Sequence, residues 1–552
     1  MKLKGSQIIM ECLKEQGIDI IFGYPGGQIM PLYDALYDYL GEIKHVLTSH
    51  EQGATHAADG YARSTGKIGV CFATSGPGAT NTVTGIATAY MDSVPMIVIT
   101  GQVPLSLIGK DAFQEVDITG ITIPITKHNF FISSVADIAP TIRRAFQIAA
   151  SGRPGPVLID VPKNLMLEIC EYEKAEPYGK LPHGDIDQTA IEEVSKLINK
   201  AKRPIIYSGG GIIISEASVE LTKIAEKAQI PVSSTLMGLG SFSRRNPLSL
   251  GMVGMHGEKE ANLAMHNCDL VIAIGARFSD RVTGDVNRFA QEATIIHIDV
   301  DESEISKNVK ADIHIIGDIK DILTSMIPMI EKQDHKDWLQ KIHNWKKEKI
   351  EDKEKFNPEN IFKILNEILG DDVIVVTEVG QHQMWTAQMW PFTKPRTLIS
   401  SGGLGTMGFG LGAAIGTQMA NPGKRVLHIA GDGCFRMNCN ELITVAAQKL
   451  PIITVVLKNN TLGMVRQWQK LFFSKRYSAT DLPDIVDYVK LSEAMGLNAN
   501  LAIDLDGLKD ALAKAKDRKT GTVIICDIHI DENVFPIVPP GEALNNQVSS
   551  EE

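Results

Sequence analysis

The sequence lacks both an excess of positive charge and any long apolar run. Its 552 residues carry a formal net charge of -11, which argues against nucleic acid or an anionic membrane as the main partner, because both select basic surfaces. No apolar stretch reaches the roughly 18 residues that a membrane-spanning helix requires. Residues 1–17 are amphipathic and charged, and they lack the uninterrupted apolar core of a signal peptide. We therefore expect a protein with no membrane and no nucleic-acid partner.

Cysteine is scarce, and no two cysteines form a CxxC pair. Their number, seven, is odd, and most of them lie in apolar runs. This pattern indicates reduced thiols in the cytoplasm and argues against a disulfide scaffold or a zinc site. The cysteines are Cys12, Cys71, Cys170, Cys268, Cys434, Cys439 and Cys526.

Two familiar nucleotide-binding motifs are also absent. Residues 75–81, Ser-Gly-Pro-Gly-Ala-Thr-Asn, follow an apolar strand, but no Gly-Lys-Ser/Thr of a P-loop comes after them. The glycine triplet at 209–211 also follows an apolar strand, and it lacks the GxGxxG spacing. The first loop is either a glycine turn that presents backbone N–H groups to a ligand or an ordinary connection between a strand and a helix.

What is present is a series of short apolar runs that end in glycine or polar residues. Most of the runs are continuous rather than alternating, as in strands buried on both faces of a parallel sheet, and helical patterns separate them. The sequence therefore predicts an α/β protein built from doubly wound parallel sheets. The runs are 95–100, 156–161, 269–275, 295–300, 372–376, 426–430, 452–457 and 523–526.

Two polar stretches divide this series into three domains. Residues 171–188 are rich in charge, proline and glycine, and residues 331–358 combine an amphipathic helix with a dense run of charges. Both are interpreted as linkers. We expect domains at 1–170, 189–330 and 358–540, and then a polar tail, 541–552, that is mobile unless a ligand orders it.

Asp432 and Asn459 each follow an apolar run, at the point where a strand is expected to end. Asp432 lies between Gly431 and Gly433, and Asn459 lies 27 positions further on. Carboxylate and amide oxygens are hard ligands that suit Mg²⁺, and flanking glycines let a phosphate approach the backbone. The pair predicts a magnesium-held diphosphate, with an Asx turn at each strand end as the alternative.

Other segments also carry residues that could bind a ligand. A carboxylate such as Glu51 could share a proton with a ligand nitrogen in a dry crevice, although a surface glutamate in the first turn of a helix is the more ordinary interpretation. Gly275, Arg277 and Asp299 lie at strand ends of one domain and favour nucleotide binding over structural glycines and surface ion pairs. Residues 463–468 are either a stripe of core residues or the lining of an apolar pocket.

In order, these segments resemble the thiamine-diphosphate-dependent 2-keto acid decarboxylases and carboligases, and within them the large, catalytic subunits of the acetohydroxyacid (acetolactate) synthases. The resemblance covers nearly the whole chain. It implies a pyrimidine-binding first domain, a Rossmann-like FAD-binding central domain and a third domain that binds diphosphate and magnesium. The matching segments are 22–27, 50–54, 75–81, 101–104, 111–115, 151–156, 402–410 and 431–433.

The resemblance also implies site residues. Glu51, Gln114 and Lys163 would be catalytic, with Glu51 hydrogen-bonded to N1′ of the aminopyrimidine of the cofactor. The Mg²⁺ ligands would be Asp432, Asn459 and the backbone oxygen of Thr461, where a gapless count from Asp432 selects Asn459 over Asn460. Thiamine diphosphate would contact Tyr24, Gly26, Glu51, Val379, Gly380, Gln381, His382, Met407, Gly431, Gly433, Cys434 and Met464. FAD would contact Arg153, Gly209, Gly210, Gly211, Thr235, Leu236, Met237, Met255, His256, Gly275, Ala276, Arg277, Arg281, Asp299 and Asp318. The substrate would meet Phe113, Met464, Val465 and Trp468.

The implied activity is decarboxylation of pyruvate and transfer of the remaining two-carbon unit to a second 2-keto acid. The products would be 2-acetolactate or 2-aceto-2-hydroxybutyrate, the first common step of branched-chain amino acid biosynthesis. FAD would be structural, because no net redox occurs. The resemblance further implies active sites shared between subunits of a homodimer or homotetramer, and a small regulatory subunit is a further candidate partner. The alternatives are a catabolic acetolactate synthase without FAD, an enzyme like pyruvate oxidase and, in a different class, a non-catalytic nucleotide-binding protein.

Overall fold

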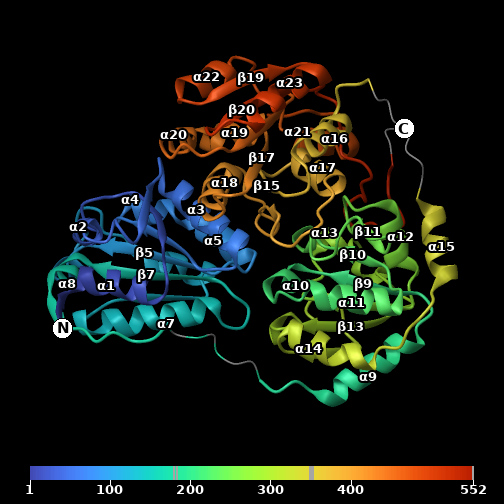
Figure 1. Cartoon of the computed structure of the whole chain (residues 1–552), viewed down its shortest axis with the longest axis horizontal. Helices are drawn as coiled ribbons and strands as arrows, with labels where there is room; N and C mark the ends of the chain where they lie inside the picture. The colour runs from blue at the N-terminus through green and yellow to red at the C-terminus, as the bar shows by residue number, and fades with distance from the viewer. Residues whose placement is uncertain (178, 180, 182–183, 347–353, 550–552) are drawn as a thin grey trace.

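The chain forms three six-stranded sheets, each with parallel strands and helices on its faces (Figure 1). The structure is a computed structural model and describes residues 1–177, 179, 181, 184–346 and 354–549. The predicted linkers therefore lie partly outside the described residues. No helix of the described part of the chain is both long enough and apolar enough to cross a membrane.

The first and third sheets share one strand order, whereas the central sheet runs from its third strand through its second to its first and then crosses over to its fourth. In the first domain the order is β3-β2-β4-β5-β7-β6, in the central domain β11-β10-β9-β12-β13-β14 and in the third β16-β15-β17-β18-β20-β19. A short antiparallel pair, β1 (Lys2–Lys4) with β8 (Ile169–Glu171), closes the first domain. The sheet strands are β2 (Ile20–Gly23), β3 (Lys44–Leu47), β4 (Gly69–Ala73), β5 (Met96–Gln102), β6 (His128–Phe131), β7 (Pro156–Pro162), β9 (Pro204–Ser208), β10 (Val232–Ser234), β11 (Ser249–Met252), β12 (Leu270–Ile274), β13 (Thr294–Asp299), β14 (Ile313–Ile316), β15 (Val373–Thr377), β16 (Leu398–Ile399), β17 (Arg425–Gly431), β18 (Ile453–Lys458), β19 (Asn498–Ala502) and β20 (Thr522–Asp527).

The central strands are buried along their whole length, which is why their sequences are continuous apolar runs. Every residue of β5, β7, β12 and β15 is buried, as expected when helices cover both faces of a parallel sheet. The prediction of an α/β protein with doubly wound parallel sheets is confirmed. The helices are α1 (Gly5–Glu15), α2 (Met30–Tyr37), α3 (Glu51–Thr65), α4 (Pro77–Asn81), α5 (Val83–Met91), α6 (Ile118–Thr122), α7 (Ile138–Ala150), α8 (Lys163–Leu167), α9 (Gln188–Lys200), α10 (Gly210–Ile214), α11 (Ser218–Ala228), α12 (Lys259–Asn267), α13 (Asp280–Thr283), α14 (Ile319–Met326), α15 (Lys336–Trp345), α16 (Pro358–Leu369), α17 (Gln381–Met389), α18 (Phe409–Ala420), α19 (Asp432–Asn438), α20 (Leu442–Ala447), α21 (Gly463–Phe472), α22 (Tyr488–Ala494) and α23 (Leu505–Lys516).

Helix α3 of the first domain packs directly on α18 of the third, and Figure 1 shows the two helices at the boundary between these domains. Small residues make the close approach feasible. A Cβ atom at Gly60 would overlap the carbonyl of Ala413, and one at Gly416 would overlap the carbonyl of Ala57. One hydrophobic cluster consequently runs through both domains, whereas the central domain has clusters of its own.

The C-terminal tail differs from the expectation of a mobile segment. Val538, Ala543 and Leu544 are buried, and the N–H of Val538 donates to the carbonyl of Met255 at 2.8 Å. Residue Ile537 forms a bridge with Val548. The expectation was wrong for residues 541–549 because a few apolar side chains in a polar stretch pack onto the central domain; residues 550–552 lie outside the described residues.

The contact between α3 and α18 generates a stability prediction. Gly416→Ala should lower the free energy of unfolding by about 1–3 kcal/mol, because the overlap with the Ala57 carbonyl outweighs the gain in helix propensity. Thermal or urea unfolding measures the change. Gly423→Ala is the control, since a Cβ at that position meets nothing within 4 Å. Equal stability of the two variants would contradict the close packing described.

Candidate functional site

The proposed metal ligands lie at the ends of two neighbouring strands of the third sheet. Strand β17 runs into Asp432, and the adjacent strand β18 runs into Asn459 and Thr461. Asp432 is only 1% exposed. Its carboxylate accepts the N–H of Gly433 at 3.1 Å and that of Asn460 at 2.9 Å. The two predicted ligands thus share one corner of the sheet.

The electrostatics of this corner fit a cation. Burial raises the pKa of Asp432 to about 6, and the backbone hydrogen bonds it accepts only partly oppose that rise. The side-chain oxygen of Asn459 accepts the N–H of Thr461 at 3.4 Å, and its amide nitrogen donates to Gln381 at 3.4 Å. The Asx-type contact that the alternative interpretation, an Asx turn at the strand end, requires is therefore present at Asn459. It coexists with a carboxylate and an amide oxygen that are the donor types Mg²⁺ prefers.

A buried polar atom without a partner lies beside this corner. His382, in the first turn of α17, is buried, and burial lowers its pKa to about 3, so its imidazole is neutral. Its Nε2 has no hydrogen-bond partner among the described residues. A Cβ at Gly431 would lie 2.9 Å from the Nδ1 of His382. The absence of a side chain at Gly431 lets this imidazole lie against the backbone before Asp432. Its Nε2 still needs a partner, which a bound diphosphate group would supply.

The turn that carries Met407 is held by a carboxylate that the sequence analysis missed. Glu378 accepts the N–H of Gly408 at 2.7 Å and that of Gly410 at 2.9 Å, both at the start of α18. Gly408 has φ of +86°, a left-handed conformation suited to glycine. The methyl group of Met407 lies 3.8 Å from where a Cβ of Gly433 would be. The position of Glu378, directly before Val379 at a strand end, was the signal available in the sequence.

Glu51 occupies a second corner, in the first domain. It is the first residue of α3 and is 8% exposed, so the surface interpretation was wrong. Its Oε2 accepts the side-chain N–H of Asn81 at 3.0 Å. A Cβ at Gly78 would lie 3.1 Å from its Oε1, so the glycine keeps that space clear. The loop at 75–81 thus packs against Glu51. The contribution of Asn81 was missed, because nothing in the spacing shows where its side chain points.

A large cavity of about 1030 Å³ lies among the three domains and gathers the residues expected to bind FAD. All of them line it except Gly209, which packs against the carbonyl of Gly275. Arg153 spans two domains across its wall, with ion pairs to Asp301 at 3.2 Å and Glu304 at 2.7 Å. Burial raises the pKa of Asp299 to about 6. Glycines at strand ends, an arginine and a buried aspartate are the groups that a dinucleotide requires.

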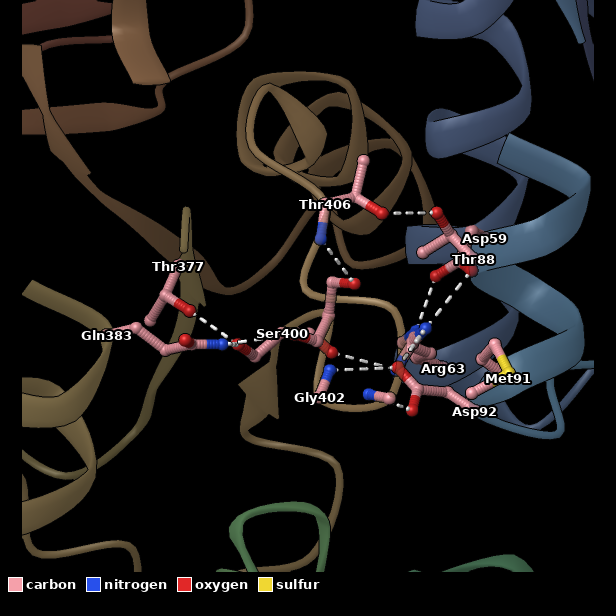
Figure 2. Close-up of polar contacts among 12 residues, drawn as sticks. Asp59, Arg63, Thr88, Met91, Asp92, Thr377, Gln383, Ser400, Gly402 and Thr406 are labelled. Atoms are coloured by element: carbon pink, nitrogen blue, oxygen red, sulfur yellow. Dashed lines mark hydrogen bonds and ion pairs between the residues drawn. The ribbon is translucent and has the colours of Figure 1, made fainter. Parts of the chain in front are cut away.

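The segment between this cavity and Met407 is fixed by buried charges from the first domain (Figure 2). Arg63, near the end of α3, pairs with Asp59 and with Asp92, the latter at 3.1 Å. The same guanidinium donates to the carbonyl of Ser400 at 2.9 Å. The two oxygens of Asp92 accept the N–H groups of Gly402 at 3.0 Å and of Gly403 at 2.8 Å. This network was also missed, because each residue looks like an ordinary helix charge in the sequence.

The expected substrate residues divide into two groups. Met464 and Trp468, on α21, line both the large cavity and an adjoining one of about 730 Å³, and Val465 lines the smaller cavity and is 49% exposed. The apolar stripe is therefore a cavity lining. Phe113 is 84% exposed. Gln114, Lys163 and Glu51 also belong to the first domain and, like Phe113, line neither cavity. The expected site residues of the first domain therefore do not line the cavities that Met464 and Trp468 line.

The remaining residues expected to bind thiamine diphosphate follow the same division. Tyr24 and Gly26 come directly after β2 in the first domain, and Gly26 lies against the side chain of Thr74. Val379 and Gly380 line the large cavity, and the thiol of Cys434 donates to the carbonyl of Val379 at 3.0 Å. Burial raises the pKa of the Cys434 thiol, so it stays protonated.

Comparison with known families agrees with this architecture. Three family models match in order: the thiamine pyrophosphate enzyme N-terminal TPP binding domain at 3–121, the central domain at 191–326 and the C-terminal TPP binding domain at 378–526.

Curated relatives match along nearly the entire chain. A probable acetolactate synthase large subunit of Methanocaldococcus jannaschii is 48% identical, over 99% of this chain and 95% of its own length. The acetolactate synthase large subunit of Parasynechococcus marenigrum is 47% identical, over 98% and 90%. That of Haemophilus influenzae is 41% identical, over 100% and 98%.

The buried carboxyl of Asp432 generates a pH prediction. A raised pKa means that the metal-free protein holds this proton until the pH exceeds about 6, and Mg²⁺ must displace it. The affinity for Mg²⁺ at fixed thiamine diphosphate should therefore rise as the pH increases through about 6 and level off above it. Calorimetric titration at several pH values measures this rise.

The Asp432→Asn variant separates the pH dependence of Mg²⁺ affinity that comes from Asp432 from the part that comes from the cofactor. The variant should bind Mg²⁺ more weakly and keep only the pH dependence of the phosphates of the cofactor. Asp510→Asn, on the exposed side of α23, is the control. Identical pH profiles for the parent protein and Asp432→Asn would exclude Asp432 as a ligand.

Proposed function

The chain belongs to the large subunits of the acetolactate synthases, among the thiamine pyrophosphate enzymes, and we propose that it joins two 2-keto acids with loss of carbon dioxide. Pyruvate would be the donor. Pyruvate or 2-ketobutyrate would be the acceptor, giving 2-acetolactate or 2-aceto-2-hydroxybutyrate. The observation that carries the proposal is the pair of half-sites, one around Glu51 and one around Asp432 and Asn459, in a chain of this family.

Each half-site has a separate task in this reaction. When bound, thiamine diphosphate supplies the electron sink for the loss of carbon dioxide. Asp432, Asn459 and the carbonyl of Thr461 would hold the Mg²⁺ that anchors the diphosphate. Glu51, oriented by Asn81 at 3.0 Å, would hold a proton against the N1′ nitrogen of the pyrimidine. Its burial keeps water away from that proton.

The apolar wall of the site would control the fate of the two-carbon unit. Met464 and Trp468 line both cavities, and their side chains would exclude water from an acceptor bound against them. Packing against Trp468 can also distinguish acceptors that differ by one methylene, a preference of about 1–3 kcal/mol.

FAD is the cofactor that we propose for the large cavity. Its volume of about 1030 Å³ suits a dinucleotide. Because the overall reaction needs no net electron transfer, the flavin would be structural. This separates the proposal from two alternatives: a catabolic acetolactate synthase would not bind the flavin, and an enzyme like pyruvate oxidase would reduce it.

A second copy of the chain would complete each site. Phe113 is a large apolar side chain that is 84% exposed, and a second copy that covered it would remove this apolar surface from water. Neither Phe113 nor Glu51 lines the cavities that Met464 lines. A homodimer in which the first domain of one copy faces the third domain of the other would bring them together. A homotetramer of two such dimers would contain the same sites.

The proposed activity is tested by a product assay. Purified protein with pyruvate, thiamine diphosphate and Mg²⁺ should form acetolactate, and the purified protein should show the absorption bands of an oxidised flavin. Removal of FAD should abolish the activity, and adding FAD back should restore it. Bleaching of the flavin during turnover would instead support the oxidase, and full activity without flavin would support the catabolic enzyme.

The shared site is tested by mixing two inactive variants. Glu51→Gln and Asp432→Ala proteins, unfolded and refolded together, should regain about a quarter of the wild-type activity, because half of the dimers are mixed and each mixed dimer keeps one intact site. Each variant refolded alone is the control and should remain inactive. No recovery in the mixture would contradict a site built from two copies.

A further inference from the structure

A buried carboxylate of the third domain accepts hydrogen bonds from the backbone immediately before Glu51. Glu441, the last residue of the short helix η8 (Cys439–Glu441), is 0% exposed. The N–H of Ser49 donates to both of its oxygens, at 3.1 and 3.2 Å. The hydroxyl of Ser49 donates to the carbonyl of Asn440 at 3.0 Å. The backbone two residues ahead of Glu51 is therefore held by a different domain of the same chain.

The fit between Glu441 and α3 is tight on the other side of Glu51 as well. A Cβ at Gly53 would overlap the Oε1 of Glu441. The hydroxyl of Thr444 donates to the Oε2 of Glu441 at 2.6 Å, so the carboxylate has little freedom to rotate. Ser49 and Gly53 bracket Glu51, and both touch Glu441. The unpaired N–H groups at the start of α3 also favour the nearby carboxylate of Glu441.

The segment that carries Glu441 begins at Asp432. Helix α19 starts with Asp432 and leads directly into η8, whose last residue is Glu441. One end of this segment thus belongs to the proposed magnesium corner, and the other end contacts the corner of Glu51.

We propose that Glu441 is a positioning residue for Glu51, and that it connects the two half-sites of each chain. The inference rests on the proposed function. In the proposed dimer the half-sites of one chain belong to two different active sites. Glu441 therefore links the magnesium corner of one active site to the proton-holding glutamate of the other. A change in the setting of α19 in one site would then change the orientation of Glu51 in its neighbour.

Mixed dimers that carry Glu441→Gln in only one of their two chains test this proposal directly. The substituted amide keeps the size of the side chain but replaces one of the two oxygens that accept the N–H of Ser49 by an N–H donor. In the mixture of Asp432→Ala and Glu51→Gln chains, the one intact site takes its Glu51 from the Asp432→Ala chain. Adding Glu441→Gln to that chain should lower kcat about 10- to 100-fold, the range typical when a supporting contact to a catalytic group is lost.

The same substitution in the other chain should change the activity less than about twofold, since that chain supplies only the magnesium corner. Equal losses in the two placements would overturn the proposal. They would show that Glu441 supports the dimer as a whole and not the orientation of Glu51.

A second measurement does not depend on how the site is shared. The rate at which the C2 proton of bound thiamine diphosphate exchanges with deuterium, followed by NMR, reports on Glu51 without acetolactate formation. In uniform Glu441→Gln protein this rate should fall about 10- to 100-fold, while the affinity for Mg²⁺ stays within about twofold. Glu441→Asp, which keeps the charge, should recover part of the rate. An unchanged exchange rate would overturn the proposal.

Glu15→Gln is the matched control. Like Glu441, Glu15 is a buried carboxylate that accepts a backbone N–H, that of Ala175 at 2.8 Å, but it belongs to the first domain and pairs with Arg143. This substitution should lower the unfolding temperature without altering C2 exchange. If wild-type protein exchanges the C2 proton but makes no acetolactate, the proposed function fails while the role of Glu441 is still decided by the exchange rates.

Discussion

The close contact between α3 and α18 is the constraint on which the other features depend. Gly60 and Gly416 allow backbone to meet backbone there, and no larger side chain fits either position. Helix α3 begins at Glu51 and carries Arg63 near its other end, whereas α18 starts directly after the turn of Met407. A single helix pair therefore sets the relative position of Glu51, the Met407 turn and the loop beside the large cavity.

Buried carboxylates maintain this arrangement at three places. Glu378 secures the start of α18, Glu441 secures the start of α3, and Asp92 secures the loop between the large cavity and Met407. Each accepts backbone N–H groups, and Asp92 also pairs with Arg63. Burying a carboxylate is costly unless such partners are exact in position. Glu378 acts within the third domain, whereas Glu441 and Asp92 each bind backbone of the other domain. These two contacts therefore favour one relative placement of the first and third domains.

Much of this could be predicted from the sequence, and the reason is local. Continuous apolar runs identify strands such as β12 and β15 because both faces of each strand are covered. Residues at strand ends, such as Asp432 and Arg277, can be placed because parallel strands all end at one edge of the sheet. The cavity lining expected from the resemblance agrees with the structure except at Gly209, where a glycine serves the packing of two loops instead.

What could not be predicted depends on contacts between distant segments. Ser49 and Glu441 are far apart in sequence, and a surface glutamate and a buried one look alike until the domains are placed. Arg63 and Asp92 were hidden for the same reason. The tail was misjudged because Val538 and Leu544 are isolated apolar residues, and only their packing on the central domain shows that they are part of a core.

That tail has a mechanical consequence. Besides direct contacts such as the Arg245–Asp371 ion pair, the chain itself links the central domain to the third domain twice: before α16, and again through the returning segment, where Val538 bonds to Met255 and Asp285 bonds to Glu542. Two domains linked by one segment can rotate apart about it. Domains linked by two segments can separate only after one of the segments has detached. Separation of the central and third domains around the large cavity therefore requires the apolar side chains of the tail to leave the core first.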